Sequence, residues 1–210
     1  MASGIEAFRT LKLELEKAKF VLATCPDFPR SSIEAMKSAR EELTQLFSQE
    51  SIVRLCRDCK DNCCKRFPCD RLSPYDLFYC AAIGFEPPEP DWELQNHNDF
   101  MSQFGCLFLA RNGCILKENR RLICLGLICP ELQENLMRRN QYIHFLKTFR
   151  ELEEASKIFC FEILKRLRGL DETTKVFLEY YFNKLTERCQ KPLFVPEVKN
   201  FSELTKAVRS

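Results

Sequence analysis

The sequence predicts a mainly α-helical protein with a cysteine-rich metal-binding centre that contains a short β-hairpin. Apolar residues recur at three- and four-residue spacings near both ends of the chain, which is the pattern of amphipathic helices. Ten of the thirteen cysteines lie between positions 51 and 130. With 210 residues and 45% hydrophobic content, the chain can bury about 70% of its unfolded surface, so a core does not require disulfides.

Four regions are expected, which together form one compact domain. Their boundaries follow changes in cysteine density, apolar periodicity and proline content. No internal repeat and no low-complexity tract interrupts them. The regions are an N-terminal helical hairpin at 1–50, a cysteine-rich metal-binding region at 51–130, C-terminal helices at 131–190 and an extended tail at 191–210.

The first two predicted helices are separated by a short segment that begins and ends with proline. The run from Pro26 to Pro29 ends the first helix, because proline lacks the amide hydrogen that a helix uses. Ser31 and Glu34 have the spacing of a capping box, so a second helix is expected to about residue 49. The first apolar stripe, within residues 4–22, is Ile5, Phe8, Leu11, Leu15 and Ala18. The second stripe is Ile33, Met36, Leu43, Leu46 and Phe47.

A short hairpin is predicted inside the cysteine-rich region. The segments CLFL and CILK flank the pair Asn112-Gly113, which is a favoured hairpin turn, so residues 106–117 are expected to form two short strands. Cys106 and Cys114 would then lie about three strand steps apart, on the order of 10 Å at roughly 3.3 Å per residue. This separation is too large for one tetrahedral ion, so the two cysteines would bind different metals or opposite corners of a cluster.

Helical periodicity returns in the C-terminal part of the chain. It runs from Leu132 to about Leu167, and Gly169 then supplies a helix stop. Asp171 has the side chain of an N-cap, which predicts a further helix to about Arg188.

Charge and composition exclude several classes of protein. The 32 basic and 30 acidic residues give a net charge of +2, so no nucleic acid partner is expected. No segment approaches eighteen consecutive apolar residues, so no membrane span is expected. Acidic residues interrupt the first twenty positions, unlike a signal peptide. A cytoplasmic protein is therefore expected, in which the cysteines stay reduced. Thirteen cysteines, an odd number, also could not all pair within one chain.

Eight cysteines fall into two groups with the spacing of metal ligands. Residues 56–69 read CRDCKDNCCKRFPC, and the first group within them has the pattern C-x2-C-x3-C-C. A C-x2-C turn lets two thiolates face one ion, as in zinc and iron-sulfur sites. If the two groups close on each other, metal binding energy becomes part of the folding energy. The predicted metal ligands are Cys56, Cys59, Cys63, Cys64, Cys106, Cys114, Cys124 and Cys129.

The other cysteines and the histidines are expected to play different parts. Cys80 and Cys160 lie among apolar and aromatic residues, which favours core positions. Cys69 lies within reach of the first group, and its role stays open. The residues without a ligand pattern are Cys25, Cys189, His97 and His144.

Three stretches of the chain carry a family resemblance. They are the first cysteine group, LSPYD at 72–76 and FGCLFLARNGCILKENRRLIC at 104–124. In these stretches the chain resembles the CxxCxxCC family of zinc- or iron-chelating proteins, whose relatives include flagellin lysine N-methylases. In the third stretch the family pattern is a cysteine, a short strand, a glycine turn, a second cysteine, an Arg-Pro pair and a third cysteine. This chain has one extra residue between Cys59 and Cys63, and Arg121 in place of the proline. The matching positions are Cys106, Gly113, Cys114, Arg120 and Cys124.

The resemblance covers about residues 54–130 and implies a metal site more firmly than a reaction. Zinc and a [4Fe-4S] cluster are nearly even alternatives, because an all-sulfur ligand set suits both. The favoured function is a metal-binding protein whose multi-cysteine site organises an α-rich fold and could also dock a protein partner. The alternative is an iron-sulfur-dependent redox or lysine N-methylation function like that of the flagellin N-methylases.

Sequence motifs of enzymes are mostly absent. The six glycines are scattered and form neither a GxGxxG nor a Walker pattern, so no self-contained nucleotide- or SAM-binding domain is expected. The motifs HExxH and GxSxG do not occur. A cysteine nucleophile would need an orienting histidine, and the chain has only two histidines. The protein is therefore expected not to be an enzyme, and no catalytic residue is assigned.

Overall fold

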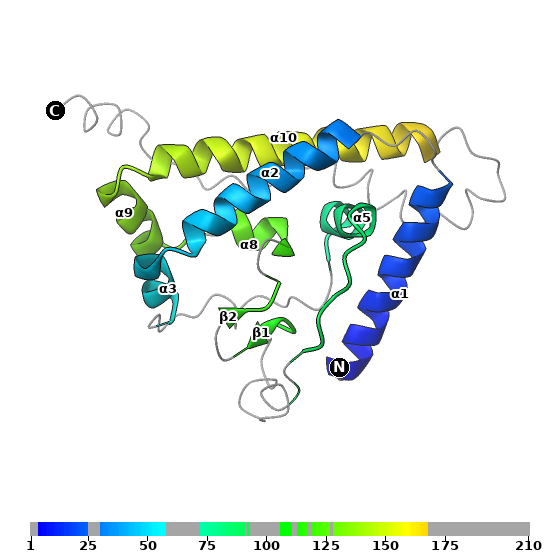
Figure 1. Ribbon diagram of the computed structural model, residues 1–210, viewed down its shortest axis with the longest axis horizontal. Helices are drawn as coiled ribbons and strands as arrows, with labels where there is room; N and C mark the ends of the chain where they lie inside the picture. Colours follow the sequence, from blue (N-terminus) through cyan, green and yellow to red (C-terminus); the bar gives the residue numbers. More distant parts are fainter. Residues whose placement is uncertain are drawn as a thin grey trace.

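A computed structural model gives the architecture of this protein, which is mainly helical as the sequence predicts (Figure 1). The residues that the structure describes are 4–24, 30–57, 72–90, 92, 106–110, 113–116, 119–126 and 128–167. The described helices are α1 (Gly4–Ala23), α2 (Arg30–Phe47), α3 (Glu50–Arg57), α5 (Pro74–Ala82), α8 (Leu122–Gly126), α9 (Pro130–Arg138) and α10 (Tyr142–Leu167). The described strands are β1 (Leu109–Ala110) and β2 (Gly113–Cys114).

The two N-terminal helices form close to their predicted positions. The buried stripe of α1 matches the prediction except at its start, where Ile5 is exposed, and Val21 extends the stripe at the other end. Helix α2 begins at Arg30, so Ser31 lies inside the first turn instead of capping it. The helix therefore begins two residues earlier than a Ser31 cap predicts, a shift within the usual uncertainty of helix ends.

These two helices do not pack as the hairpin predicted for residues 1–50. Helix α1 packs against α5, and α2 lies along α10, as Figure 1 shows. At one end of the α2 and α10 pair, the rings of Phe47 and Phe145 meet edge to face, with centroids 6.0 Å apart. Apolar spacing defines which face of a helix is buried but not which partner covers it, so the prediction of a packed hairpin was wrong.

The helical stretch predicted from Leu132 to Leu167 is broken into α9 and α10. Asn140 has a left-handed φ of 56°, a conformation that asparagine tolerates better than most residues. The N–H groups of Asn140 and Gln141 donate to the carbonyl oxygens of Met137 and Leu136, at 3.0 and 2.8 Å. This pattern is a Schellman motif, which closes α9 and lets the chain turn into α10.

The described β-pairing is shorter than the predicted hairpin at 106–117. Leu109 lies opposite Cys114 and Ala110 opposite Gly113, in antiparallel register. The N–H of Ile115 also donates to the carbonyl oxygen of Phe108 at 2.9 Å. In this register Cys106 lies three residues along the chain from the residue that faces Cys114.

One hydrophobic cluster joins every described helix, and β1 and β2 are attached to it through the apolar residues beside them. Helix α8 approaches α10 closely at Gly126, where an added Cβ would collide with the ring of Phe149. Among the described helices, none is long and apolar enough to cross a membrane. The predicted helix at 171–188 and the tail at 191–210 lie outside the described residues.

The substitution Gly126→Ala tests the contact between α8 and α10. Overpacking against Phe149 should cost about 1–3 kcal/mol, of which the better helix propensity of alanine returns at most about 1 kcal/mol. Urea unfolding would measure the loss. Adding Phe149→Leu makes room for the methyl group, so the double variant should lose less than the sum of the single losses. Wild-type stability in Gly126→Ala would contradict the close approach.

Candidate functional site

The structure describes the second predicted cysteine group and little of the first. Cys106 is buried before β1, whereas Cys114 in β2, Cys124 in α8 and Cys129 before α9 are partly exposed. Cys56 lies in the last turn of α3. Among the described residues, no three His, Cys, Asp or Glu side chains gather closely enough to hold a metal ion. The predicted ligands outside the described residues are Cys59, Cys63 and Cys64, and Cys69 lies there too.

Cys129 occupies a helix cap. Its Sγ accepts a hydrogen bond from the backbone N–H of Leu132 at 3.4 Å, and Pro130 follows in the first turn of α9. A sulfur at a helix N-terminus faces the positive end of the helix dipole. Backbone amides that point at sulfur are also common around thiolate-bound metals. Cys129 therefore has surroundings that suit a ligand.

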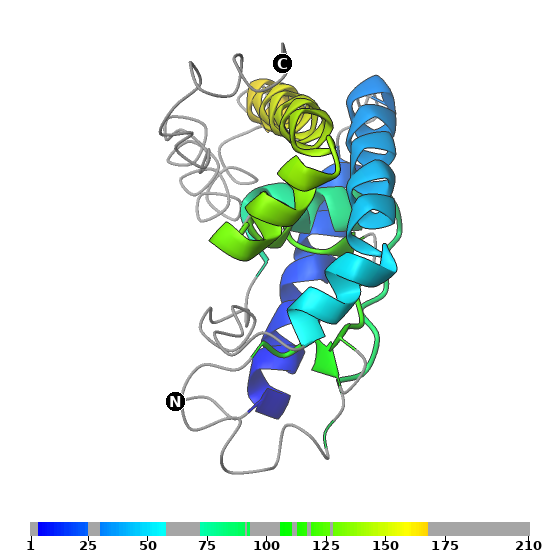
Figure 2. The ribbon, with the colours of Figure 1, turned by 90° about the vertical axis from the view of Figure 1, so that its left-hand side faces the viewer.

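Helices α3 and α9 lie side by side, which Figures 1 and 2 both show. Arg139, at the C-terminal end of α9, donates a hydrogen bond to the side chain of Gln49, which directly precedes α3. Because the C-terminal end of α9 meets the N-terminal end of α3, the two short helices run antiparallel. The end of α3 that carries Cys56 is thereby directed toward the end of α9 that Cys129 caps.

A buried ion pair lies close to the segment that carries Cys124. Arg40 on α2 and Asp76 on α5 are each 1% exposed, and Arg40 Nη2 lies 2.7 Å from Asp76 Oδ1. The guanidinium carbon of Arg40 stands 4.4 Å from the centre of the Tyr79 ring, a cation-π contact. Removal of either charge would leave the other buried without its partner, so the pair holds α2 and α5 together.

The same two side chains bind the backbone at the start of α8. Asp76 Oδ1 accepts a hydrogen bond from the N–H of Leu122 at 2.8 Å, and Arg40 Nη1 donates to the carbonyl oxygen of Arg120. The hydroxyl of Ser73 donates to the other carboxylate oxygen of Asp76. One ion pair thus joins α2, α5 and the first residue of α8, close to Cys124 in the chain.

The sequence carries a signal for half of this network. In the stretch Ser73-Pro74-Tyr75-Asp76, Ser73 caps α5, and its Oγ accepts from the N–H of Asp76 at 3.3 Å. An acidic side chain at this position commonly turns back to the cap. Asp76 also reaches Arg40, which the sequence did not identify as important. An arginine in an amphipathic helix is usually a surface residue, so spacing alone does not reveal it.

Cys80 is a core residue, as the sequence predicts, and its surroundings do not suit a ligand. It lies on α5 one turn after Asp76 and is 1% exposed. Burial is the main cause that raises the pKa of its thiol to about 12; the charge of Arg40 lowers this pKa and that of Asp76 raises it. The thiol therefore keeps its proton at neutral pH, whereas metals bind the thiolate. Cys160 on α10 is likewise buried, which confirms its predicted core position.

His144 lies on the surface of α10. Its Nε2 is 3.1 Å from Glu42 Oε1, in a half-exposed contact between α10 and α2. Such exposed contacts contribute about 1 kcal/mol or less. His97 lies outside the described residues.

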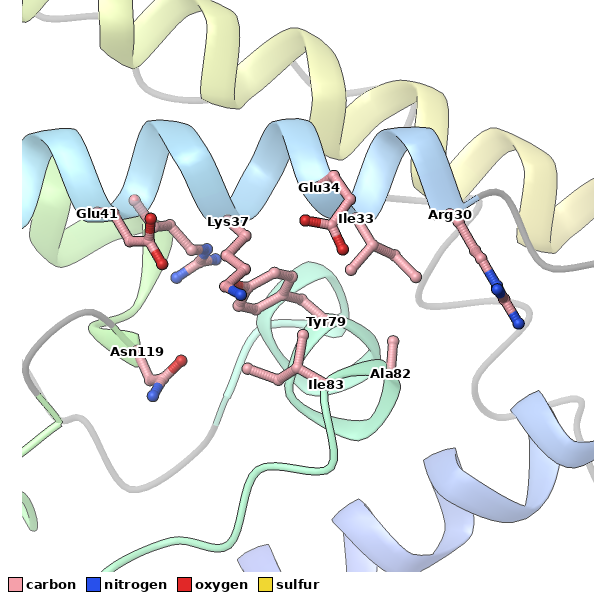
Figure 3. Close-up of a pocket in the computed structure, with 10 residues that line it drawn as sticks. Arg30, Ile33, Glu34, Lys37, Glu41, Tyr79, Ala82, Ile83 and Asn119 are labelled. Carbon is pink, nitrogen blue, oxygen red and sulfur yellow. The ribbon is translucent and has the colours of Figure 1, made fainter.

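A groove of about 560 Å³ runs between α2 and α5 beside Arg40. Figure 3 shows Glu34, Lys37 and Glu41 of α2 on one side of it, and Tyr79 of α5 and Ile83, which directly follows α5, on the other. Side chains of both charges line the groove, and none of its lining residues is a cysteine. This groove is therefore not the predicted metal site.

No family model, curated protein or solved structure matches this chain. The resemblance to the CxxCxxCC family consequently rests on its quoted motifs and stays a prediction. Support for a metal site has to come from the positions of the chain's own cysteines, of which Cys129 and the backbone of Cys56 are the most informative.

The ion pair should dominate local stability. We expect Asp76→Ala to lower the free energy of unfolding by about 3–5 kcal/mol, because Arg40 would stay buried without its partner. Replacing both charges, in Arg40→Met with Asp76→Leu, should cost less than the single change. Urea unfolding of the three proteins measures both effects. A loss below about 1 kcal/mol in Asp76→Ala would be typical of a surface pair and would contradict the buried geometry.

Cys80 should make stability fall at alkaline pH. Its folded pKa of about 12 lies above the ordinary 9.0, so the unfolded thiol loses its proton first as the pH rises. The contribution of the buried thiol is complete below pH 9 and is lost as the pH approaches 12. Wild-type stability should therefore decrease relative to Cys80→Ala over this range, in urea unfolding with reductant present. A constant difference between the two proteins would refute this assignment.

Proposed function

We propose that this protein binds metal through its clustered cysteines, as zinc or as a [4Fe-4S] cluster, and that the metal site organises the α-rich fold. The observation that supports this most is the antiparallel pair of α3 and α9, which directs the Cys56 end of one helix toward the Cys129 cap of the other. The proposed ligands are Cys56, Cys59, Cys63, Cys64, Cys106, Cys114, Cys124 and Cys129.

The cysteine ligands suit either a zinc ion or a [4Fe-4S] cluster, because thiolates bind both. Within the second group, Cys114, Cys124 and Cys129 belong to β2, α8 and the cap of α9, three elements that follow one another along the chain. Ligation would tie these short elements to each other and to α3. Metal binding energy would then contribute directly to folding energy.

The proposal allows for more than one metal position. Cys114 lies in β2, whereas Cys106 precedes β1 and is separated from it by a turn at Leu107 and Phe108, so the two cysteines belong to different local structures. Two zinc ions or separate corners of one cluster would accommodate both.

Arg120 is a source of positive charge four residues before Cys124 in the chain. Its Nε is buried and has no hydrogen-bond partner within the described part of the chain. This donor is therefore available to a group in the neighbouring segments, and several thiolates on one site carry negative charge that a guanidinium offsets. We propose that Arg120 faces the sulfurs.

The role we propose is noncatalytic: the protein stores, delivers or senses metal, or docks a protein partner through the metal-organised domain. Such a site needs reduced cysteines, which fits a cytoplasmic location. The iron-sulfur-dependent redox or lysine N-methylation alternative needs a cluster, and the same metal analysis tests it.

Metal content decides between zinc and a [4Fe-4S] cluster. After anaerobic purification, a colourless protein with about two zinc ions per chain would support zinc, and a brown protein with about four iron and four sulfide would support a cluster. Cys124→Ala should lose metal and stability, whereas Cys160→Ala, at a buried core position, should keep its metal. A metal-free wild-type protein, or full metal content in Cys124→Ala and Cys56→Ala, would refute the proposed site.

A further inference from the structure

We propose that Arg40 and Asp76 are positioning residues for Cys124, which hold the short helix α8 in the place where its sulfur can ligate metal. This inference rests on the proposed metal site. It goes beyond that site because neither residue is a ligand: Arg40 lies on α2, before the cysteine-rich region, and Asp76 lies on α5, between the two cysteine groups.

The first support is that α8 cannot hold its own shape. It spans five residues, and isolated helices of this length are not stable in water. Its internal hydrogen bonds include those from the N–H groups of Cys124 and Leu125 to the carbonyl oxygen of Arg121, at 2.9 and 3.0 Å. The position of Cys124 therefore depends on what fixes the ends of α8.

The N-terminal end of α8 is fixed by the ion pair. Asp76 accepts the N–H of Leu122, and Arg40 donates to the carbonyl oxygen of Arg120, so one peptide segment is held by both an acceptor and a donor. Hydrogen bonds to charged groups are roughly twice as strong as neutral ones. Both charged side chains are buried and pair with each other, which leaves them little freedom to move.

The C-terminal end of α8 is fixed by packing. Gly126 lies so close to the Phe149 ring of α10 that even a methyl group would collide with it. Cys124 sits between this contact and the ion pair, two residues from each of Leu122 and Gly126. The sulfur is carried by a segment that is anchored on both sides.

The contribution of the pair to metal binding is geometric. Because Arg40 and Asp76 neutralise each other, they add no net charge near the thiolates. Groups that orient a ligand from outside the coordination shell typically change metal affinity by roughly 10–100-fold. We expect an effect of this size from the ion pair.

The test separates positioning from stability. The main variant is Arg40→Met with Asp76→Leu, which removes both backbone contacts while avoiding an unpaired buried charge. The control is Ile163→Ala, a fully buried position near the far end of α10, where a loss of about 2–5 kcal/mol is expected. Asp76→Asn serves as the main variant if the double variant does not fold.

Two measurements are made on these proteins. Amide hydrogen exchange on the metal-free protein compares residues 122–126 with Phe145 to Leu152 of α10, so that global unfolding cancels. We expect exchange in α8 to become about tenfold faster relative to α10 in the main variant and to stay unchanged in the control. Cobalt(II) titration, followed by thiolate charge-transfer absorption, should show roughly 10–100-fold weaker binding in the main variant only.

The outcomes are distinct. Unchanged relative exchange in α8 would overturn the anchoring by the ion pair. If exchange in α8 of the main variant is faster but its cobalt affinity equals that of the control, the role of the ion pair in positioning Cys124 would be overturned. A wild-type protein that shows no thiolate absorption on adding cobalt, and that carries no iron and sulfide after anaerobic purification, would refute the proposed function instead. Hydrogen exchange would still decide whether the pair holds α8.

Discussion

Two opposite charges, on Arg40 and Asp76, are removed from water where α2, α5 and α8 meet. The arrangement of these helices depends on hydrogen-bond partners for both charged side chains. A buried ion pair needs good geometry and further hydrogen bonds to offset the loss of water. Here the further partners are Ser73, the N–H of Leu122 and the carbonyl oxygen of Arg120, while Arg40 Nε is buried and has no hydrogen-bond partner in the described part of the chain. Because Leu122 and Arg120 are distant in the chain from both charged residues, the pair specifies which segments must meet.

The sequence predicts where the helices lie along the chain better than it predicts which helices pack against each other. The apolar stripe of α1 is correct at Phe8, Leu11, Leu15 and Ala18, since a 3.6-residue period is a property of each helix alone. The pairing of α2 with α10 depends on side chains more than ninety positions apart, and periodicity carries no information about it. The break at Asn140 also escaped prediction, because asparagine tolerates both helical and left-handed conformations.

For the candidate site, cysteine spacing names the residues but not their geometry. The surroundings of Cys129 follow from a cap whose sulfur receives a backbone N–H, which a sequence can suggest only where a helix start is already known. Cys80 shows the opposite case, in which an apolar context correctly indicated a core thiol. Arg40 could not have been found by its type, because only the tertiary structure distinguishes it from a solvated arginine.

The ion pair also affects how the chain folds as it is made. Its contacts span 36 residues from Arg40 to Asp76, 46 from Asp76 to Leu122 and 80 from Arg40 to Arg120. Such non-local contacts form late, after the cost of closing long loops has been met. During synthesis, α2 therefore carries a solvated Arg40 until the chain has grown past residue 122. The full set of partners becomes available only when the cysteine-bearing segments before α8 have also been made, so completion of this core and assembly of the cysteine region coincide in time.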